Sequence, residues 1–130
     1  MRHKIAMAIG ASFLAVAGTV GFSSTALAQP HPSAIAASYF VLYEDDNYSG
    51  RHANFSGSDV ELNNKYWSGS TSAFAQNGGS SMENNTSSNV GLWDKGTTCT
   101  GTSYTAKANS KDSDFSNNNF DNKASCVRFL

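Results

Sequence analysis

The amino-acid sequence predicts a small all-β domain, a sandwich or barrel of short strands that follows an N-terminal leader. Short runs of aromatic and β-branched residues alternate with turns rich in Gly, Asn, Asp and Ser, which is typical of such folds. No segment after the leader keeps apolar residues at helical spacing over three turns. A weak internal repeat also indicates that one supersecondary unit occurs twice.

The N-terminus has the organisation of a secretory signal peptide. Residues 2–4 are basic, residues 5–22 are apolar or small without charge, and residues 26–28 (Ala-Leu-Ala) form a small-residue cleavage site. The alternative is a membrane anchor, because the segment approaches the length of a short span, but the cleavage site favours removal. We therefore expect residues 1–28 to be a signal peptide, residues 29–38 to be a flexible lead-in, and the protein to be secreted.

The folded part is expected to begin at residue 39. Residues 39–43 (Tyr-Phe-Val-Leu-Tyr) form the first predicted strand, which ends in a polar turn at residues 44–47. Residues 51–55 form a second strand and residues 57–59 (Gly-Ser-Asp) another turn. Further strands are predicted at residues 89–93 and 124–130.

The repeat relates residues 42–45 (Leu-Tyr-Glu-Asp) to residues 92–95 (Leu-Trp-Asp-Lys). In each half a glycine and an aromatic residue follow this run. Each half also contains a polar hexad, at residues 83–88 (Glu-Asn-Asn-Thr-Ser-Ser) and at residues 121–126 (Asp-Asn-Lys-Ala-Ser-Cys). Because a single such unit seldom buries its own apolar face, we expect the two halves to pack together.

The chain contains two cysteines, Cys99 and Cys126, both after the leader. In an exported protein an even pair indicates a disulfide. Closing a loop of this length contributes about 3–4 kcal/mol to the free energy of unfolding in the chain-entropy model. Two free thiols or a metal-binding pair are the less favoured alternatives, since two cysteines alone are too few for a structural zinc site.

Composition and motifs argue against nucleic-acid binding and catalysis. The chain carries 9 Lys and Arg against 10 Asp and Glu, without the basic stripe of a nucleic-acid-binding protein. It has no nucleophile elbow, zinc-binding helix or phosphate-binding loop. The acidic run at residues 44–46 is more typical of a solvated turn than of a glycosidase carboxylate pair. We expect a non-enzymatic monomer with no membrane or nucleic-acid partner once the leader is removed.

These features resemble the βγ-crystallin superfamily, whose signature is two Greek-key motifs. The run from Leu42 to Gly50 resembles the aromatic hairpin that opens each motif, and residues 120–127 resemble the ending of a motif. Among secreted bacterial members, the chain is similar to the streptomycete metalloproteinase inhibitor family and to a small killer-toxin-like group. The resemblance covers residues 39–130 and implies a βγ-crystallin-like sandwich of two Greek-key motifs.

In that superfamily the paired hexads form calcium sites, so the resemblance implies calcium as a cofactor. Calcium takes about six to eight oxygen ligands. Ser87 and Ser125 would supply hydroxyl groups, and Asn85 and Lys123 would supply backbone carbonyls. Side-chain oxygens would come from the other members of the hexads, Glu83, Asn84, Asp121 and Asn122. The alternative is that both hexads are turns that cap strand ends through local hydrogen bonds.

The resemblance to the inhibitor family implies a secreted proteinase inhibitor directed at an extracellular metalloprotease. An inhibitor needs a stiff binding loop, because ordering a loose one weakens binding. Residues 63–82 form a long connection, and Tyr66, Trp67 and Phe74 are its candidate anchors, since aromatic residues dominate hot spots. For Tyr66 and Trp67 the alternative is a place in the core, and this alternative is favoured for Trp67. Two other functions stay open: a calcium-stabilised structural or stress module, and a killer-toxin-like or glycan-binding protein.

Overall fold

The computed structural model describes residues 38–130. The predicted signal peptide and nearly all of the predicted lead-in lie outside the described residues. No helix within the described part of the chain is long and apolar enough to cross a membrane.

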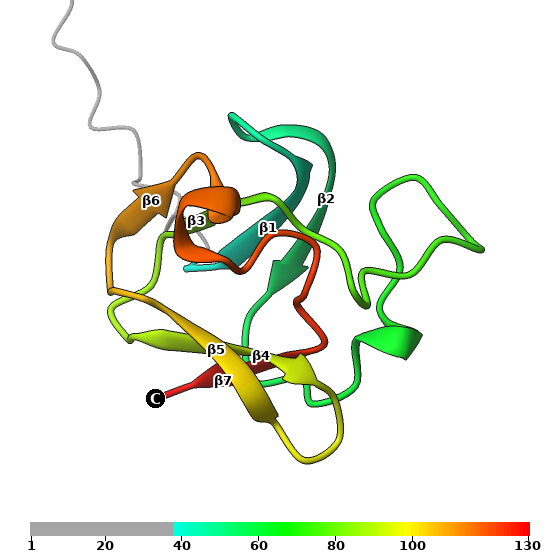
Figure 1. The fold of residues 1–130 in the computed structure, drawn as a ribbon. Coiled ribbons are helices and arrows are strands. Elements are labelled where there is room, and N and C mark those ends of the chain that lie inside the picture. Colours follow the sequence, from blue (N-terminus) through cyan, green and yellow to red (C-terminus); the bar gives the residue numbers. More distant parts are fainter. Residues whose placement is uncertain (1–37) are drawn as a thin grey trace, which may run out of the picture. The chain divides into compact units, whose positions relative to one another are not determined.

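Two antiparallel sheets make up the domain (Figure 1). The larger has the strand order β2-β1-β3-β6 and the smaller the order β5-β4-β7. The strands are β1 (Phe40–Asp45), β2 (Ser49–Phe55), β3 (Ser81–Asn84), β4 (Val90–Lys95), β5 (Thr100–Ala106), β6 (Ser110–Asp112) and β7 (Cys126–Phe129), with short 3-10 helices η1 (Leu62–Asn64) and η2 (Phe115–Asn118). The predicted all-β class is confirmed.

The internal repeat corresponds to two interlocked Greek-key motifs. The hairpins β1–β2 and β4–β5 carry the same irregularity, a register shift between Tyr43 and Asp45 in one and between Trp93 and Lys95 in the other. Strand β6 of the second half pairs with β3 of the first. In return, Asp59 of the first half bridges to β7. Each half therefore completes the other's sheet, as expected for units that cannot bury their apolar faces alone.

The core lies between the two sheets and follows the two-residue alternation of a strand. In β1, Phe40 and Leu42 are fully buried, whereas Val41 and Tyr43 are not. Phe115 and Phe120 are also fully buried. The sequence around them is rich in Asn and Ser and does not predict this burial. Burying such a side chain stabilises the fold by about 1.5–3 kcal/mol.

The predicted disulfide joins Cys99 to Cys126, with 5.5 Å between the two Cα atoms. It ties the turn between β4 and β5 to the first residue of β7. Disulfides persist in oxidising compartments, so this bond is consistent with export.

Candidate functional site

Part of the long connection between β2 and β3 folds back on itself as a small hairpin, residues 65–75, here called the aromatic hairpin. The Ala75 N–H donates to the Lys65 carbonyl at 2.7 Å, and the Trp67 N–H donates to the Ala73 carbonyl at 3.0 Å. At the tip, a tight turn closes with a bond from the Ser70 N–H to the Trp67 carbonyl at 3.0 Å. Gly69 holds the left-handed position of that turn with φ +72°.

The three aromatic residues predicted as anchors divide between two roles. Tyr66 and Phe74 are 45% and 42% exposed, and their rings stack with centroids 4.7 Å apart. Trp67 points the other way and is 4% exposed, within the core. Its ring packs directly against Gly78, where a Cβ atom would lie 2.8 Å from the indole. Trp67 thus fixes the aromatic hairpin to the core, while Tyr66 and Phe74 face solvent.

The tip of the aromatic hairpin is also bound to the edge of β2. The Ser68 N–H donates to the His52 carbonyl at 2.8 Å, and the His52 N–H donates to Ser68 Oγ at 3.1 Å. Ser68 Oγ lies 3.2 Å from His52 Nδ1. Ser70 Oγ accepts from the Ala73 N–H at 2.9 Å. These bonds hold the hairpin in one shape, so little ordering remains when a partner binds.

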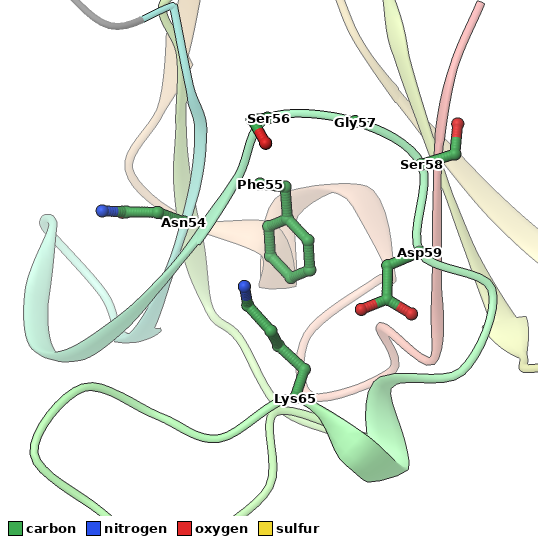
Figure 2. A pocket seen from close by; sticks show the side chains of 7 residues that line it. All are labelled: Asn54, Phe55, Ser56, Gly57, Ser58, Asp59 and Lys65. Atoms are coloured by element: carbon green, nitrogen blue, oxygen red, sulfur yellow. The ribbon is translucent and has the colours of Figure 1, made fainter.

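The base of the aromatic hairpin adjoins a small polar pocket of about 260 Å³. Figure 2 shows the Lys65 side chain reaching toward the Phe55 ring, with the Asp59 carboxylate across the pocket. Lys65 Nζ lies 4.9 Å from the ring centroid, a cation–π contact. The pocket is lined by Asn54, Phe55, Ser56, Gly57, Ser58, Asp59 and Lys65. Lys65 therefore fastens the base of the hairpin to the end of β2.

The turn between β4 and β5 is a second stiff, exposed tip. Thr97 and Cys99 both have positive φ values, 57° and 49°, and Cys99 is held by the disulfide. The Thr97 N–H donates to the Val60 carbonyl at 2.6 Å, and its hydroxyl donates to Glu61 Oε1 at 2.9 Å. Cys99 was the one signal in the sequence that this turn is rigid.

The structure corrects the register of the first polar hexad. Residues 121–126 lead into β7, and the segment that leads into β3 in the same way is residues 76–81 (Gln-Asn-Gly-Gly-Ser-Ser). The Asn77 N–H donates to the Ala124 carbonyl at 2.8 Å, and the Asn122 N–H donates to the Gly79 carbonyl at 3.0 Å. Asn77 and Asn122 also share a left-handed backbone, with φ 52° and 54°. These two segments are therefore the paired turns.

Residues 83–88, predicted as the first hexad, serve the sheet instead. Glu83 lies in β3, where Lys111 Nζ donates to its carboxylate at 2.7 Å and holds the pKa of Glu83 below its ordinary value. Asn84 is fully buried, and its Nδ2 donates to the carbonyls of Ser88, Ala106 and Lys107. Asn85 and the Ser87 side chain are outside this network, at exposed positions after the strand. The composition of residues 83–88 matches the motif, but these residues start inside β3, whereas the paired turns precede their strands.

The second predicted hexad does lie at a pair of turns. Ser125 Oγ donates to Asn77 Oδ1 at 2.7 Å, which joins the two segments. Asn122 Nδ2 donates to Asp121 Oδ2 at 3.0 Å, whereas Asp121 Oδ1 is buried without a hydrogen-bond partner among residues 38–130. Lys123 donates through Nζ to the Asn119 carbonyl. Within the same described residues, no group of three or more His, Cys, Asp or Glu has an arrangement that would hold a metal.

Residues 28–106 match the model of peptidase inhibitor family I36. The chain belongs to this family. Membership assigns it to a group of inhibitors rather than enzymes, and it implies a peptidase as partner. No curated protein matches the chain.

The solved structures similar to the chain include several βγ-crystallins. One comes from work on the evolution of the eye lens βγ-crystallin domain fold, with 15% identity over 72% of this chain and 85% of that chain and a TM-score of 0.60. A βγ-crystallin from Ciona intestinalis has 21% identity over 71% and 99% of the two chains and a TM-score of 0.56. An archaeal βγ-crystallin has 15% identity over 71% and 96%, with a TM-score of 0.55. At these identities the likeness establishes the βγ-crystallin fold, as predicted.

Proposed function

We propose that this family I36 protein is a secreted inhibitor of extracellular metalloproteases and that it contacts its target through the aromatic hairpin. The observation that carries the proposal is the exposed Tyr66–Phe74 pair on a hairpin already fixed by the core and by β2. The choice of metalloproteases rests on the resemblance of the hairpin and ending motifs to the streptomycete inhibitor family. The predicted signal peptide and the disulfide support secretion.

The two aromatic side chains are suited to be the energetic centre of an interface. Tyr and other aromatic residues are enriched among hot spots, and a hot-spot truncation costs about 2 kcal/mol or more. Because the aromatic hairpin is already ordered, a partner gains most of the free energy of burying Tyr66 and Phe74. Trp67 contributes indirectly, by holding the hairpin in place from below.

The test is a titration of the secreted chain, recovered from culture medium, against a panel of metalloproteases that includes a thermolysin-like enzyme. A serine peptidase serves as the class control. We expect stoichiometric loss of metalloprotease activity, and about a thirtyfold rise in the inhibition constant for Tyr66→Ala or Phe74→Ala. Thr71→Ala at the tip of the aromatic hairpin is the matched control. Inhibition confined to the serine peptidase, or no inhibition at tenfold excess, would reject the proposed target class.

We also propose, as a second function, weak calcium binding at the paired turns of residues 76–81 and 121–126. The observation that favours it is Asp121 Oδ1, which is buried without a hydrogen-bond partner in the described part of the chain. Negative charge also gathers nearby: the pKa of Asp46 is raised by partial desolvation and then by Asp114, Asp121 and Asp45. Calcium is coordinated by carboxylate oxygens of this kind together with hydroxyl and carbonyl oxygens. Ser125 Oγ, the amide oxygens of Asn77 and Asn122, and the turn carbonyls would complete the set.

Calorimetry with calcium chloride, with magnesium chloride as the comparison, tests this second function. A calcium-dependent heat and a rise in melting temperature are expected for the wild-type chain. Asp121→Ala should abolish both, whereas Glu83→Gln should leave both unchanged because Glu83 lies in β3 and pairs with Lys111. The opposite pattern of the two variants would restore residues 83–88 as the site, and no heat at millimolar calcium would remove the function.

A further inference from the structure

Strand β4 carries a tryptophan on the outer face of the smaller sheet. The strand lies between β5 and β7 (Figure 1), and its residues Val90 and Leu92 are fully buried in the core. Because successive side chains of a strand point to opposite faces, Gly91 and Trp93 lie on the face turned away from the core. Trp93 is accordingly only partly buried.

The indole of Trp93 lies along the strand, over Gly91. A Cβ atom at Gly91 would collide with Cη2 of the indole and would stand 2.6 Å from its Cζ3. Both atoms belong to the far, six-membered ring, and two residues of a strand span about 6.6 Å, so the long axis of the indole follows β4. Gly91 is buried beneath it. The ring therefore rests on the sheet and turns its other side to solvent.

The backbone of Gly91 does not require a glycine. Its φ is outside the positive range that favours glycine, unlike that of Gly101 in the neighbouring strand, at 89°. A glycine inside an extended strand weakens that strand, because it loses more backbone entropy on folding and contributes no side chain. What Gly91 provides instead is the space in which the indole lies.

The first half of the domain has no such arrangement. Val41 and Tyr43 hold the equivalent positions of the internal repeat, and the Val41 side chain occupies the space that a glycine leaves empty. The Tyr43 hydroxyl donates to Glu83 Oε2 at 3.2 Å, and its ring packs edge-on against Tyr48 with centroids 5.9 Å apart. The Trp93 indole N–H, by contrast, makes no hydrogen bond to residues 38–130 and is not buried. The tyrosine is held by its own chain, whereas the tryptophan is free to contact a ligand.

Free polar groups surround the indole. Trp93 pairs with Ser103, and Gly91 pairs with Thr105 and Arg128, so these side chains share one face of the sheet. All three partner residues are exposed, and their side chains make no hydrogen bond or ion pair within the described part of the chain. We call this surface, which has no acidic side chain, the tryptophan face: Gly91, Trp93, Ser103, Thr105, Cys126 and Arg128.

We propose that the tryptophan face binds a neutral polysaccharide, with one pyranose ring stacked on the indole of Trp93. A pyranose has an apolar side of C–H groups and a rim of hydroxyl groups. The tryptophan face has the matching layout, since the exposed side of an aromatic ring is surrounded by groups that hydrogen-bond to hydroxyls. Ser103 and Thr105 donate and accept, whereas Arg128 and the indole N–H donate.

This surroundings of the ring favour a sugar over a protein as the partner. In protein interfaces an aromatic hot spot is enclosed by other contacts that exclude water. Trp93 is instead the one aromatic residue of the tryptophan face, and its neighbours there are free hydroxyl and guanidinium groups. The tryptophan face also shares no residue with the aromatic hairpin, so this inference does not depend on the proposed inhibition.

The test is retention of the secreted chain on insoluble cellulose, chitin and β-1,3-glucan, with cross-linked polygalacturonate as the acidic comparison. We expect retention on at least one neutral polymer, and an affinity about tenfold lower for Trp93→Ala. Gly91→Val should lower the affinity by a similar factor although the indole is kept, because valine displaces the ring. Tyr43→Ala, at the equivalent position of the first half, is the matched control and should bind as wild type does. Thermal melting checks that each variant folds.

Tryptophan fluorescence of the wild-type chain gives a second readout that needs no variant. The sequence has two tryptophans, and Trp67 is only 4% exposed, so quenching by acrylamide reports mainly on Trp93. The soluble probes are cellohexaose, chitohexaose and laminarihexaose. We expect the hexasaccharide of the retaining polymer to shield Trp93 from acrylamide.

Three outcomes would overturn the inference. The first is no retention on any neutral polymer together with unchanged acrylamide quenching. The second is retention that persists in folded Trp93→Ala, which would place the contact on another surface. The third is retention on polygalacturonate alone, which would assign an acidic sugar. Peptidase inhibition is measured separately, so either proposal can fail while the other stands.

Discussion

In each half of the domain the turn of the hairpin is fastened to the equivalent strand, β3 in the first half and β7 in the second. The two halves use different chemistry to do so. In the first half, the Tyr48 N–H donates to Ser81 Oγ at 3.0 Å, at the first residue of β3. In the second half, a disulfide joins Cys99 to Cys126, at the first residue of β7. Tyr48 and Cys99 share a left-handed backbone, with φ 59° and 49°. The same connection between turn and strand is therefore made by a hydrogen bond in the first half and by a disulfide in the second.

Removing the covalent tie should have the largest effect on stability. We expect Cys99→Ser with Cys126→Ser to lower the free energy of unfolding by about 3–4 kcal/mol, because the unfolded chain regains loop entropy. For a domain of this size that corresponds to a fall in melting temperature of at least ~10 °C. Calorimetry of the double variant, beside wild type with and without reductant, measures it. Equal melting temperatures in all three samples would show that the tie is redundant.

The position of the aromatic hairpin on the edge of β2 depends on the close approach of Trp67 to Gly78. Adding a Cβ atom at Gly78 places it 2.8 Å from the indole and 3.1 Å from the Ala75 carbonyl oxygen, so Gly78→Ala forces the aromatic hairpin to move. Overpacking of this kind costs about 1–3 kcal/mol, and inhibition should weaken with it. Gly57→Ala is the control, since its Cβ would meet nothing within 4 Å. A Gly78→Ala protein as stable and as inhibitory as the control would mean that Trp67 does not position the hairpin.

Removing the hydrogen bonds of the Ser81 hydroxyl should lower the stability of the domain less than removing the disulfide does. Ser81 is fully buried, and besides accepting from Tyr48 it donates to the Asp45 carbonyl at 2.6 Å. Ser81→Ala leaves both backbone groups without this partner, which costs about 1–2 kcal/mol. The neighbouring Ser80→Ala removes a hydroxyl that makes no hydrogen bond to residues 38–130 and should be nearly neutral. Urea unfolding of the two variants measures the difference, and equal midpoints would refute the assigned role of Ser81.

The sequence predicted what side-chain type and spacing determine. Residues 39–43 and 89–93 were predicted as strands because they are short apolar runs with aromatic and β-branched residues that end in polar turns. Strand β5 escaped notice because its Thr and Ser side chains are exposed and give no apolar pattern. The first hexad was misplaced because Asn and Ser suit many kinds of turn, and only the pairing of Asn77 with Ala124 reveals the correct register. Trp67 and Phe74 belong to one hairpin, but composition alone does not say which of them faces the core.

The smallest predicted effect comes from an ion pair that the two halves do not share. In the first half Arg51 Nε donates to Glu44 Oε2 at 2.8 Å, whereas the equivalent positions of the second half are Asp94 and Thr102. The Arg51 hydrogen bond lowers the pKa of Glu44 below its ordinary value of 4.5. The stabilisation by the Arg51–Glu44 ion pair is therefore fully present above pH 4.5 and is lost as the pH falls through the lower pKa of Glu44 in the folded state.

Replacing Arg51 by the residue of the second half, as Arg51→Thr, tests this difference directly. Because both groups are largely solvated, we expect only a slight fall in melting temperature at pH 7, one that shrinks in high salt. The difference from wild type should disappear at a pH well below the folded-state pKa of Glu44, where the carboxyl is protonated in both states. Melting curves at both pH values measure it, with Arg128→Thr, an exposed arginine in β7, as the control. A fall in melting temperature that is equally large in acid would show that Arg51 acts by packing its aliphatic stem on the hairpin rather than by its charge.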